Sequence, residues 1–222
     1  MNKKFIYFIN PISGTGAKSF LSEIIKNKTT EKNIPFEILH TNAAGEYQFL
    51  KEKIATEKIT DVIICGGDGT VNQIAGALLG IDINIGIIPM GSGNGMAFAA
   101  KIPKRIDKAL EIIFTGKTSL VDSFYINHKF SCMLCGLGFD AQVAHDFAKQ
   151  KKRGLLTYIK LSIKNFIAAK TFPFELILDG QFYISEQAPF FLFGKIMCHL
   201  CIKTQAAKHT TKFMIDIKTI NK

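Results

Sequence analysis

The sequence of 222 residues predicts an α/β protein with two domains. Short apolar runs alternate with helical patterns over residues 1–122, as in a doubly wound, mostly parallel sheet. Glycine-rich turns follow several of these runs, most clearly Gly66-Gly67-Asp68-Gly69-Thr70. From residue 123 the pattern changes to short strand-like pieces, which predicts a β-rich second domain over residues 123–222.

The first domain is predicted from four strands and the helices between them. The strands are short runs of apolar, mostly β-branched or aromatic residues, at Phe5–Ile9, Phe36–His40, Asp61–Cys65 and Ile83–Ile88. Helical spacing predicts a core face made of Phe20, Leu21, Ile24 and Ile25 within Ala17–Lys26. Further helices are expected at Ala43–Thr56, from Val71 through Leu79, and from Met96, after the loop Gly91–Gly95.

The second domain is predicted from shorter elements. Strand-like pieces occur at Phe124–Ile126, Lys129–Leu134, Phe174–Leu178 and Phe182–Ile184. Asp179-Gly180 predicts a hairpin turn between the last two. One long helix is expected from His145 to Lys170.

That long helix is strongly basic and carries apolar residues at helical spacing. Two interpretations stay open: a solvated helix face, or an interfacial element that meets anionic lipid headgroups. Asp146 is the acidic residue that opposes its basic ones, which are Lys149, Lys151, Lys152, Arg153, Lys160, Lys164 and Lys170.

Composition limits the class of partner. The net charge of +10 favours anionic partners, but no basic run interleaved with aromatic residues indicates a nucleic-acid module, so we expect no nucleic-acid partner. The apolar N-terminal run is too short for a signal peptide, and no stretch reaches the ~18 apolar residues of a membrane span. We expect a cytoplasmic protein with peripheral membrane association, and a homodimer is kept open.

The five cysteines are interpreted as reduced thiols in a cytosolic protein. A zinc site is the alternative, because Cys132 and Cys135, and Cys198 and Cys201, have the spacing of ligand pairs. The first pair argues against it, since residues three apart on a strand face opposite sides of a sheet.

The turn around Asp68 has the composition of an anion site. Its glycines let backbone amides approach a phosphate, and the following helix adds its positive dipole end. A carboxylate there fits two roles: partner of a nucleotide-bound Mg²⁺, or base for an attacking hydroxyl. The alternative is an ordinary turn in which Asp68 caps the helix that begins at Thr70.

Four motifs, in order, resemble those of the diacylglycerol kinase catalytic-domain superfamily, which also contains sphingosine and ceramide kinases. They cover about Phe5 to about Pro189. The motifs are Asn10-Pro11-Ile12-Ser13-Gly14, Gly66-Gly67-Asp68-Gly69-Thr70-Val71-Asn72-Gln73, Pro89-Met90-Gly91-Ser92-Gly93-Asn94 and Gly136-Leu137-Gly138-Phe139-Asp140-Ala141.

The resemblance implies a fold like that of NAD kinases and phosphofructokinases, and a kinase that transfers the ATP γ-phosphoryl group to a lipid hydroxyl, such as that of diacylglycerol or a sphingoid base. It implies ATP and Mg²⁺ as cofactors, with unknown metal ligands, and an acceptor lipid at an anionic membrane surface. Asp68 is the expected catalytic residue. The expected nucleotide site consists of Asn10, Ser13, Gly14, Thr41, Gly67, Gly69, Thr70, Ser92 and Asn94.

The chain also departs from the family pattern. Gln73 stands where Glu is common, and Gly95 where Asp is common. After Pro189 the resemblance ends, so we expect a divergent or truncated second domain that lacks its final strands and has little lipid kinase activity. Two alternatives to a lipid kinase are kept: an NAD-kinase-like enzyme, and a non-catalytic nucleotide- or lipid-binding remnant.

Overall fold

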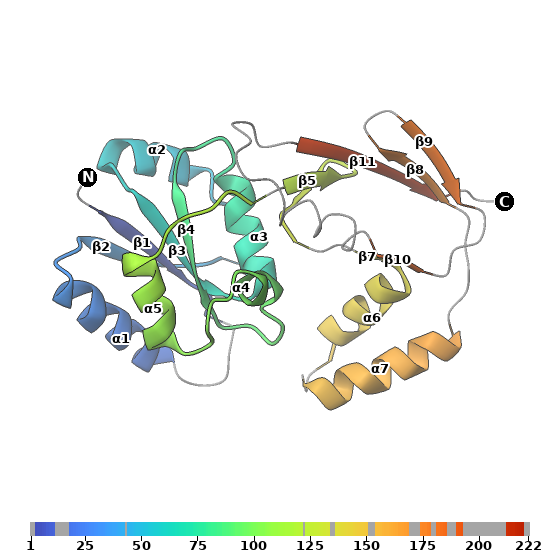
Figure 1. Ribbon diagram of the computed structural model, residues 1–222, viewed down its shortest axis with the longest axis horizontal. Helices are drawn as coiled ribbons and strands as arrows, with labels where there is room; N and C mark the ends of the chain where they lie inside the picture. The colour runs from blue at the N-terminus through green and yellow to red at the C-terminus, as the bar shows by residue number, and fades with distance from the viewer. Residues whose placement is uncertain are drawn as a thin grey trace. The chain divides into compact units, whose positions relative to one another are not determined.

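The computed structural model describes residues 3–11, 18–42, 44–121, 123–133, 136–150, 154–168, 174–178, 181–185, 190–192 and 212–219. The chain divides into two compact units, Met1–Ser119 and Leu120–Lys222, and each is described by itself. Figure 1 shows their elements. The division lies close to the boundary that the sequence predicts after residue 122.

The first unit is built on a parallel sheet of β1 (Phe5–Ile9), β2 (Phe36–His40), β3 (Asp61–Gly66) and β4 (Asn84–Pro89). The predicted α/β fold is confirmed. The strands lie in the order β2-β1-β3-β4. The chain therefore passes from β1 to β2 in one direction across the sheet, and from β3 to β4 in the opposite direction. In open α/β sheets, ligands bind outside the carboxyl ends of the strands at such a switch point.

Five helices connect or follow these strands: α1 (Lys18–Glu31), α2 (Phe49–Glu57), α3 (Asp68–Ala77), α4 (Gly95–Ala99) and α5 (Ile106–Thr115). Side chains of α1 and α5 share one buried cluster with the sheet. On the opposite side of β1, the ring of Phe8 packs edge-on against Tyr47, just before α2. Helix α5 was not predicted from the sequence.

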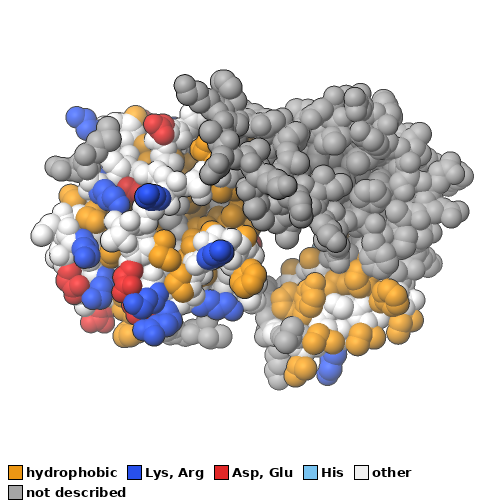
Figure 2. All heavy atoms as spheres, in the orientation of Figure 1, with side chains coloured by type: hydrophobic (Ala, Val, Ile, Leu, Met, Phe, Trp, Pro, Cys, Tyr) orange, Lys and Arg blue, Asp and Glu red, His pale blue; other side chains and the backbone are white. Residues whose placement is uncertain are grey.

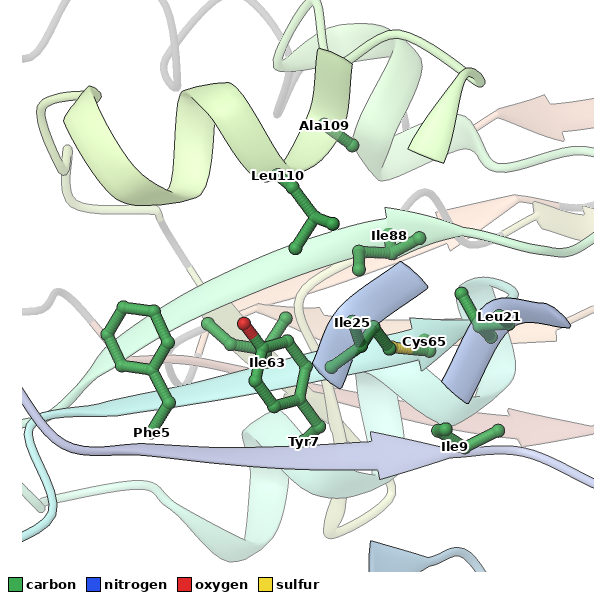
Figure 3. Close-up of a cluster of buried hydrophobic side chains, with 10 residues drawn as sticks. All are labelled: Phe5, Tyr7, Ile9, Leu21, Ile25, Ile63, Cys65, Ile88, Ala109 and Leu110. Carbon is green, nitrogen blue, oxygen red and sulfur yellow. The ribbon is translucent and has the colours of Figure 1, made fainter. Parts of the chain in front are cut away.

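The main core cluster follows the alternation of the strands. Phe5, Tyr7 and Ile9 are alternate residues of β1, and each is at most 2% exposed. Figure 3 shows them on one side of the strand, facing side chains of α1, α5, β3 and β4. Burial of each large side chain stabilises the fold by about 1.5–3 kcal/mol, so this cluster fixes the strands that carry the candidate site.

Helix α1 differs from its prediction at its end and on its core face. It continues to Glu31 rather than ending at Lys26. The added turn contains Thr29, which is fully buried and lies 2.8 Å from the Tyr7 hydroxyl, oxygen to oxygen. Burial raises the pKa of Tyr7. Phe20 is 59% exposed and therefore does not belong to the core face.

Helix α2 begins at Phe49, not at Ala43. A local turn occupies the preceding residues, since the Asn42 side-chain oxygen accepts hydrogen bonds from the amides of Gly45 (2.6 Å) and Glu46 (3.2 Å). Gly45 has φ +70°, a value outside the helical region that glycine adopts at low cost. The turn therefore excludes a helix start at this point.

The second unit contains a five-stranded sheet in the order β6-β5-β11-β8-β9. Its strands are β5 (Ser123–Ile126), β6 (Lys129–Ser131), β8 (Phe174–Leu178), β9 (Gln181–Ser185) and β11 (Lys212–Thr219). Antiparallel β8 and β9 pair Leu178 with Gln181, the register of the predicted hairpin, although residues 179 and 180 lie outside the described residues. β6 ends before the predicted Leu134, because the Ser131 hydroxyl bonds locally to the backbone of Met133.

Two strands are present after Pro189, where none was predicted from the sequence. β11 lies between β5, to which it is parallel, and β8, to which it is antiparallel. A second short strand, β10 (Phe190–Leu192), pairs with β7 (Gly136–Gly138). The strands that pair with β10 and β11 are distant from them in sequence, so the pattern of motifs could not reveal the pairing.

The prediction of a single long helix from His145 to Lys170 is wrong. Two helices are present, α6 (Phe139–Ala148) and α7 (Leu155–Ala168). They pack together through an edge-on contact of Phe147 with Tyr158 and a hydrogen bond from Asn165 to Asp146. A continuous helix would carry these residues apart. No helix within the described ranges has the length and apolar character needed to cross a bilayer.

Candidate active site at two glycine turns

The candidate site begins where β1 and β3 end. The backbone amide of Asn10 donates to the carbonyl of Cys65 (3.0 Å), which extends the pairing of the two strands. The Asn10 side-chain amide donates to the Thr70 hydroxyl (2.7 Å) at the start of α3. Thr70 is itself buried. These two predicted nucleotide residues therefore lie together at the switch point of the sheet.

Asp68 connects the two glycine turns. Its Oδ2 accepts from the Gly95 amide at 2.9 Å, and its Oδ1 from the Met96 amide at 3.1 Å. Asp68 therefore caps the first turn of α4. It is also the first residue of α3, whose N-cap residue, Gly67, makes no side-chain hydrogen bond. The alternative in which Asp68 caps its own helix is wrong. A carboxylate offers about four acceptor positions, so each oxygen keeps capacity for another ligand.

The two turns lie in close backbone contact. β3 and β4 pair Gly66 with Pro89, and the Met90 amide donates to the Gly66 carbonyl (2.9 Å). A Cβ on Gly91 would lie 2.7 Å from the Cα of Gly67, closer than side chains tolerate. Gly67 has an extended backbone. Glycine is therefore required at these positions by steric proximity rather than by an unusual dihedral angle.

Asn94 shapes the second turn. It is 5% exposed and has φ +55°, a left-handed conformation that Asn adopts more readily than most residues. Its side-chain oxygen accepts from the Gly91 amide (2.7 Å), and its side-chain nitrogen donates to the Gly91 carbonyl (2.6 Å). The carboxamide thus holds the turn in the shape that brings Gly91 against the first turn.

Thr41 lies at the end of β2, where its amide donates to the Ile9 carbonyl (3.1 Å). It lies next to Tyr47, whose pKa is raised by burial and partly lowered by the neighbouring Asn42 backbone and Thr41 side chain. A cavity of about 380 Å³ opens beside this loop. Its lining residues are Gly45, Tyr47, Gln48, Lys51, Gln73, Gly76 and Ala77.

The remaining predicted site residues differ in position. Gly69 is exposed, and a Cβ placed on it would meet nothing within 4 Å. Ser92 is exposed in the second turn. Ser13 and Gly14 lie outside the described residues. So do three cysteines of the zinc hypothesis, Cys135, Cys198 and Cys201.

The residues present fit a magnesium ion that arrives with a nucleotide. Within the described ranges, no group of three His, Cys, Asp or Glu residues could hold a metal ion. Mg²⁺ commonly uses one or two carboxylates and takes its other ligands from phosphates and water, and Asp68 supplies one. Gly95 stands where the family pattern often has a second carboxylate. A Cβ on Gly95 would lie 3.8 Å from both Asp68 carboxylate oxygens.

Sequence reasoning missed the structural partners of the site. The Gly95 and Met96 amides hold Asp68, and Gly91 makes the close contact between the turns. One signal was available: consecutive parallel strands each end in a glycine-rich turn, which brings the turns together at one edge of the sheet. Which amides the carboxylate would meet depends on the loop conformation, which the pattern does not specify.

Comparisons with known proteins show the family of this chain. The diacylglycerol kinase catalytic domain family matches residues 4–126. A probable lipid kinase YegS-like protein of Enterobacter sp. is 32% identical over 62% of this chain and 49% of its own length. Another protein of that description, from Yersinia pestis, is 30% identical over 60% of this chain and 46% of its own.

A solved structure shares the fold. The crystal structure of a diacylglycerol kinase from Bacillus anthracis superposes with a TM-score of 0.62 and 25% identity, covering 85% of this chain and 62% of that one. The chain spans about half the length of the curated relatives it matches. On its ordered motifs, its parallel sheet and the family match over residues 4–126, the chain belongs to the diacylglycerol kinase catalytic domain family.

Proposed function

We propose that this chain carries the nucleotide site of an ATP-dependent lipid kinase, which transfers the γ-phosphoryl group to a lipid hydroxyl. The observation that carries the proposal is the Asp68 carboxylate, fixed by two backbone amides between two glycine turns at the switch point. Family membership supports the reaction class. Diacylglycerol and sphingoid bases are the acceptor classes to test first.

The glycine turns suit the phosphates. The first amides of a helix have no partner within it, and the start of α3 has no side-chain cap. Gly69 leaves open space at this end, so a phosphate can approach the amides, where the helix dipole favours negative charge. The cavity next to Thr41 then offers space for the nucleoside, with Lys51 and Gln73 as polar groups.

Asp68 has one of two roles in the transfer. The lipid oxygen forms a bond to the γ-phosphorus while the bond from that phosphorus to the bridging β-oxygen breaks, and the hydroxyl proton must leave. In the first role, a free lone pair of Asp68 accepts that proton. In the second, Asp68 would hold the magnesium ion, which would neutralise phosphate charge when bound, and the proton passes to water. In both roles the backbone bonds to α4 keep the carboxylate in position, and positioning supplies most of the rate in such reactions.

Labelled ATP tests the proposal directly. The chain is incubated with γ-labelled ATP and Mg²⁺, with a lipid extract in one reaction and NAD in another. Label in the lipid fraction alone supports the proposal. Label on NAD would favour the NAD-kinase-like alternative, and no transfer with measurable ATP binding would favour the non-catalytic remnant.

A matched pair of glycine variants tests the phosphate position. In Gly69→Ala the added methyl group meets no protein atom, so stability should be kept while ATP affinity falls, because the methyl group occupies the phosphate approach. Gly80→Ala is the control, at a position beyond the C-terminal end of α3 where space is also open. Because Gly80 has a positive φ, this substitution costs stability, but it should leave ATP affinity unchanged. Unchanged ATP affinity in Gly69→Ala would contradict the proposed phosphate position.

A further inference from the structure

One face of α3 runs from the proposed phosphate position into the cavity beside the Thr41 loop. Gly69, Gln73 and Gly76 are four and three residues apart, so they fall on the same side of the helix. Gln73 lies about 6 Å beyond Gly69 along the helix axis, at 1.5 Å per residue. Gln73, Gly76 and Ala77 form the α3 wall of the cavity. A nucleotide with its phosphates at Gly69 can therefore extend along this face into the cavity.

The side chain of Gln73 has room to turn at the cavity wall. A Cβ on Gly45 would lie 3.4 Å from the Gln73 side-chain nitrogen and 3.9 Å from its oxygen. The Gly45 amide donates to the Asn42 side chain (2.6 Å), which fixes this residue of the loop. Because Gly45 has no side chain, the Gln73 carboxamide lies against backbone, and the broad two-fold preference of its last torsion allows both orientations.

The polar side chains that line the cavity are not used by the protein itself. Within the part of the chain that the structure describes, Gln48, Lys51 and Gln73 make no side-chain hydrogen bond or ion pair. Lys53 of the same helix is in contrast paired with Glu37 (2.7 Å) and Glu57 (2.6 Å). Among the described residues that line the cavity, none is acidic. Unpaired donors and acceptors around a cavity are groups that a ligand can use.

The two purine bases differ in the group that they present at carbon 6. Adenine has an amino group there, which donates, and guanine has a carbonyl oxygen, which accepts. A carboxylate only accepts, so it would suit adenine and repel the guanine oxygen. A carboxamide accepts through its oxygen and donates through its nitrogen. Gln73 stands where Glu is common in the family pattern, and it can therefore pair with either base.

Other charges of the first unit do not select the base. Figure 2 shows Lys and Arg side chains on the visible face of this unit, and long-range attraction of this kind acts on the triphosphate, which ATP and GTP share. In the cavity, the Lys51 ammonium can donate to the N7 atom that both purines carry, and to the O6 atom of guanine. The lining thus has no side chain that only accepts, which is the feature that would reject guanine.

We propose that the cavity takes the base of either purine nucleotide, with Gln73 as the specificity-determining residue. Its carboxamide accepts from the amino group of adenine or, rotated, donates to the O6 atom of guanine. The inference rests on the proposed function, because it takes the cavity as the nucleoside position. It goes beyond that function in naming GTP as a second nucleotide substrate.

Binding of each nucleotide to the full 222-residue chain is measured by calorimetry with Mg²⁺ and without lipid. ATP and GTP should bind within about tenfold of each other, and UTP, with its smaller pyrimidine base, more weakly than both. A larger preference for ATP would overturn the inference while the proposed function stands. UTP binding as tight as GTP binding would show that the base is not read, and would also overturn it. No binding of ATP or GTP would overturn the proposed function together with the inference.

Gln73→Glu tests the two orientations of the carboxamide. The substitution keeps the shape of an exposed side chain, and circular dichroism confirms that the fold is kept. GTP affinity should fall relative to ATP affinity by roughly 5- to 150-fold, the discrimination that one well-placed polar pair gives against the wrong base. Because both nucleotides carry the same triphosphate, the ratio of their affinities cancels the repulsion of that group by the added charge. An unchanged ratio would overturn the role of Gln73.

Gln48→Glu is the matched control, since it makes the same change at another residue that lines the cavity. It should leave the ratio of GTP affinity to ATP affinity at the parental value. An equal fall of the ratio in both variants would assign the effect to negative charge anywhere in the cavity, and would overturn the assignment to Gln73. Gln73→Leu removes the donor and the acceptor together, so it should weaken both nucleotides alike, and selective loss of one would contradict the proposal.

Discussion

Replacing Asp68 by Asn tests the carboxylate that joins the two glycine turns. The carboxylate accepts one amide at each oxygen, from Gly95 and from Met96. Asn keeps one acceptor oxygen and presents an NH₂ group to the other amide. Hydrogen bonds to charged groups contribute about 1.5–3 kcal/mol each, and neutral ones about 0.5–1.5. Because Gly95 is exposed, water can replace part of the loss, so we expect Asp68→Asn to cost about 1–2 kcal/mol.

Two assays separate structure from chemistry. Urea unfolding should remain cooperative with a slightly lower midpoint, because the loss is small beside the 5–15 kcal/mol stability of a typical domain. Transfer from labelled ATP to lipid should fall by about 100-fold or more, the usual range for a lost acid–base group. If Asp68 organises the metal instead, excess Mg²⁺ should recover part of the activity, whereas a missing base should not respond.

The two results refute different statements. Transfer within a few-fold of the parent would reject a catalytic role for Asp68, whatever the stability. Unchanged stability would reject its role as the cap of α4. Asp68→Glu is the companion variant: it keeps the charge but displaces the oxygens by one methylene, so it should retain folding better than transfer.

Three further outcomes follow from the contacts. Gly91→Ala should destabilise the first unit by about 1–3 kcal/mol in urea unfolding, because its Cβ would lie 2.7 Å from backbone of the facing turn; parental stability would contradict the close contact. Thr70→Val removes the acceptor of the Asn10 side chain and should cost about 1–2 kcal/mol by the same measurement. Hydrogen bonds from Asn165 and Gln142 lower the pKa of Asp146. The ionised Asp146 therefore stabilises the α6–α7 pair fully at pH values above the ordinary Asp pKa of about 4, and this stabilisation is lost as the pH falls through the lowered pKa. Near-ultraviolet circular dichroism of the Tyr158 contact should follow this acid step, and Asp146→Asn should remove it.

The sequence by itself determined the sheet of the first unit and the position of the candidate site. Phe5–Ile9 and Phe36–His40 are strands with the predicted bounds. Phe5–Ile9 is buried along its whole length, and a strand buried on both faces requires a short, continuously apolar run that few other structures accept. The turn around Asp68 was recognisable for a local reason too: its glycines stand directly between such a run and a helical pattern.

The tertiary structure alone decided the features whose partners are distant in sequence. Helix α1 is extended by the contact of Thr29 with Tyr7. Asp68 caps α4, which begins 27 residues later, and β11 enters the sheet between β5 and β8. Periodicity and turn composition report only the preferences of neighbouring residues. The partner of a buried hydroxyl, a carboxylate or a strand edge is selected by which distant segment supplies the missing hydrogen bonds once the chain has folded.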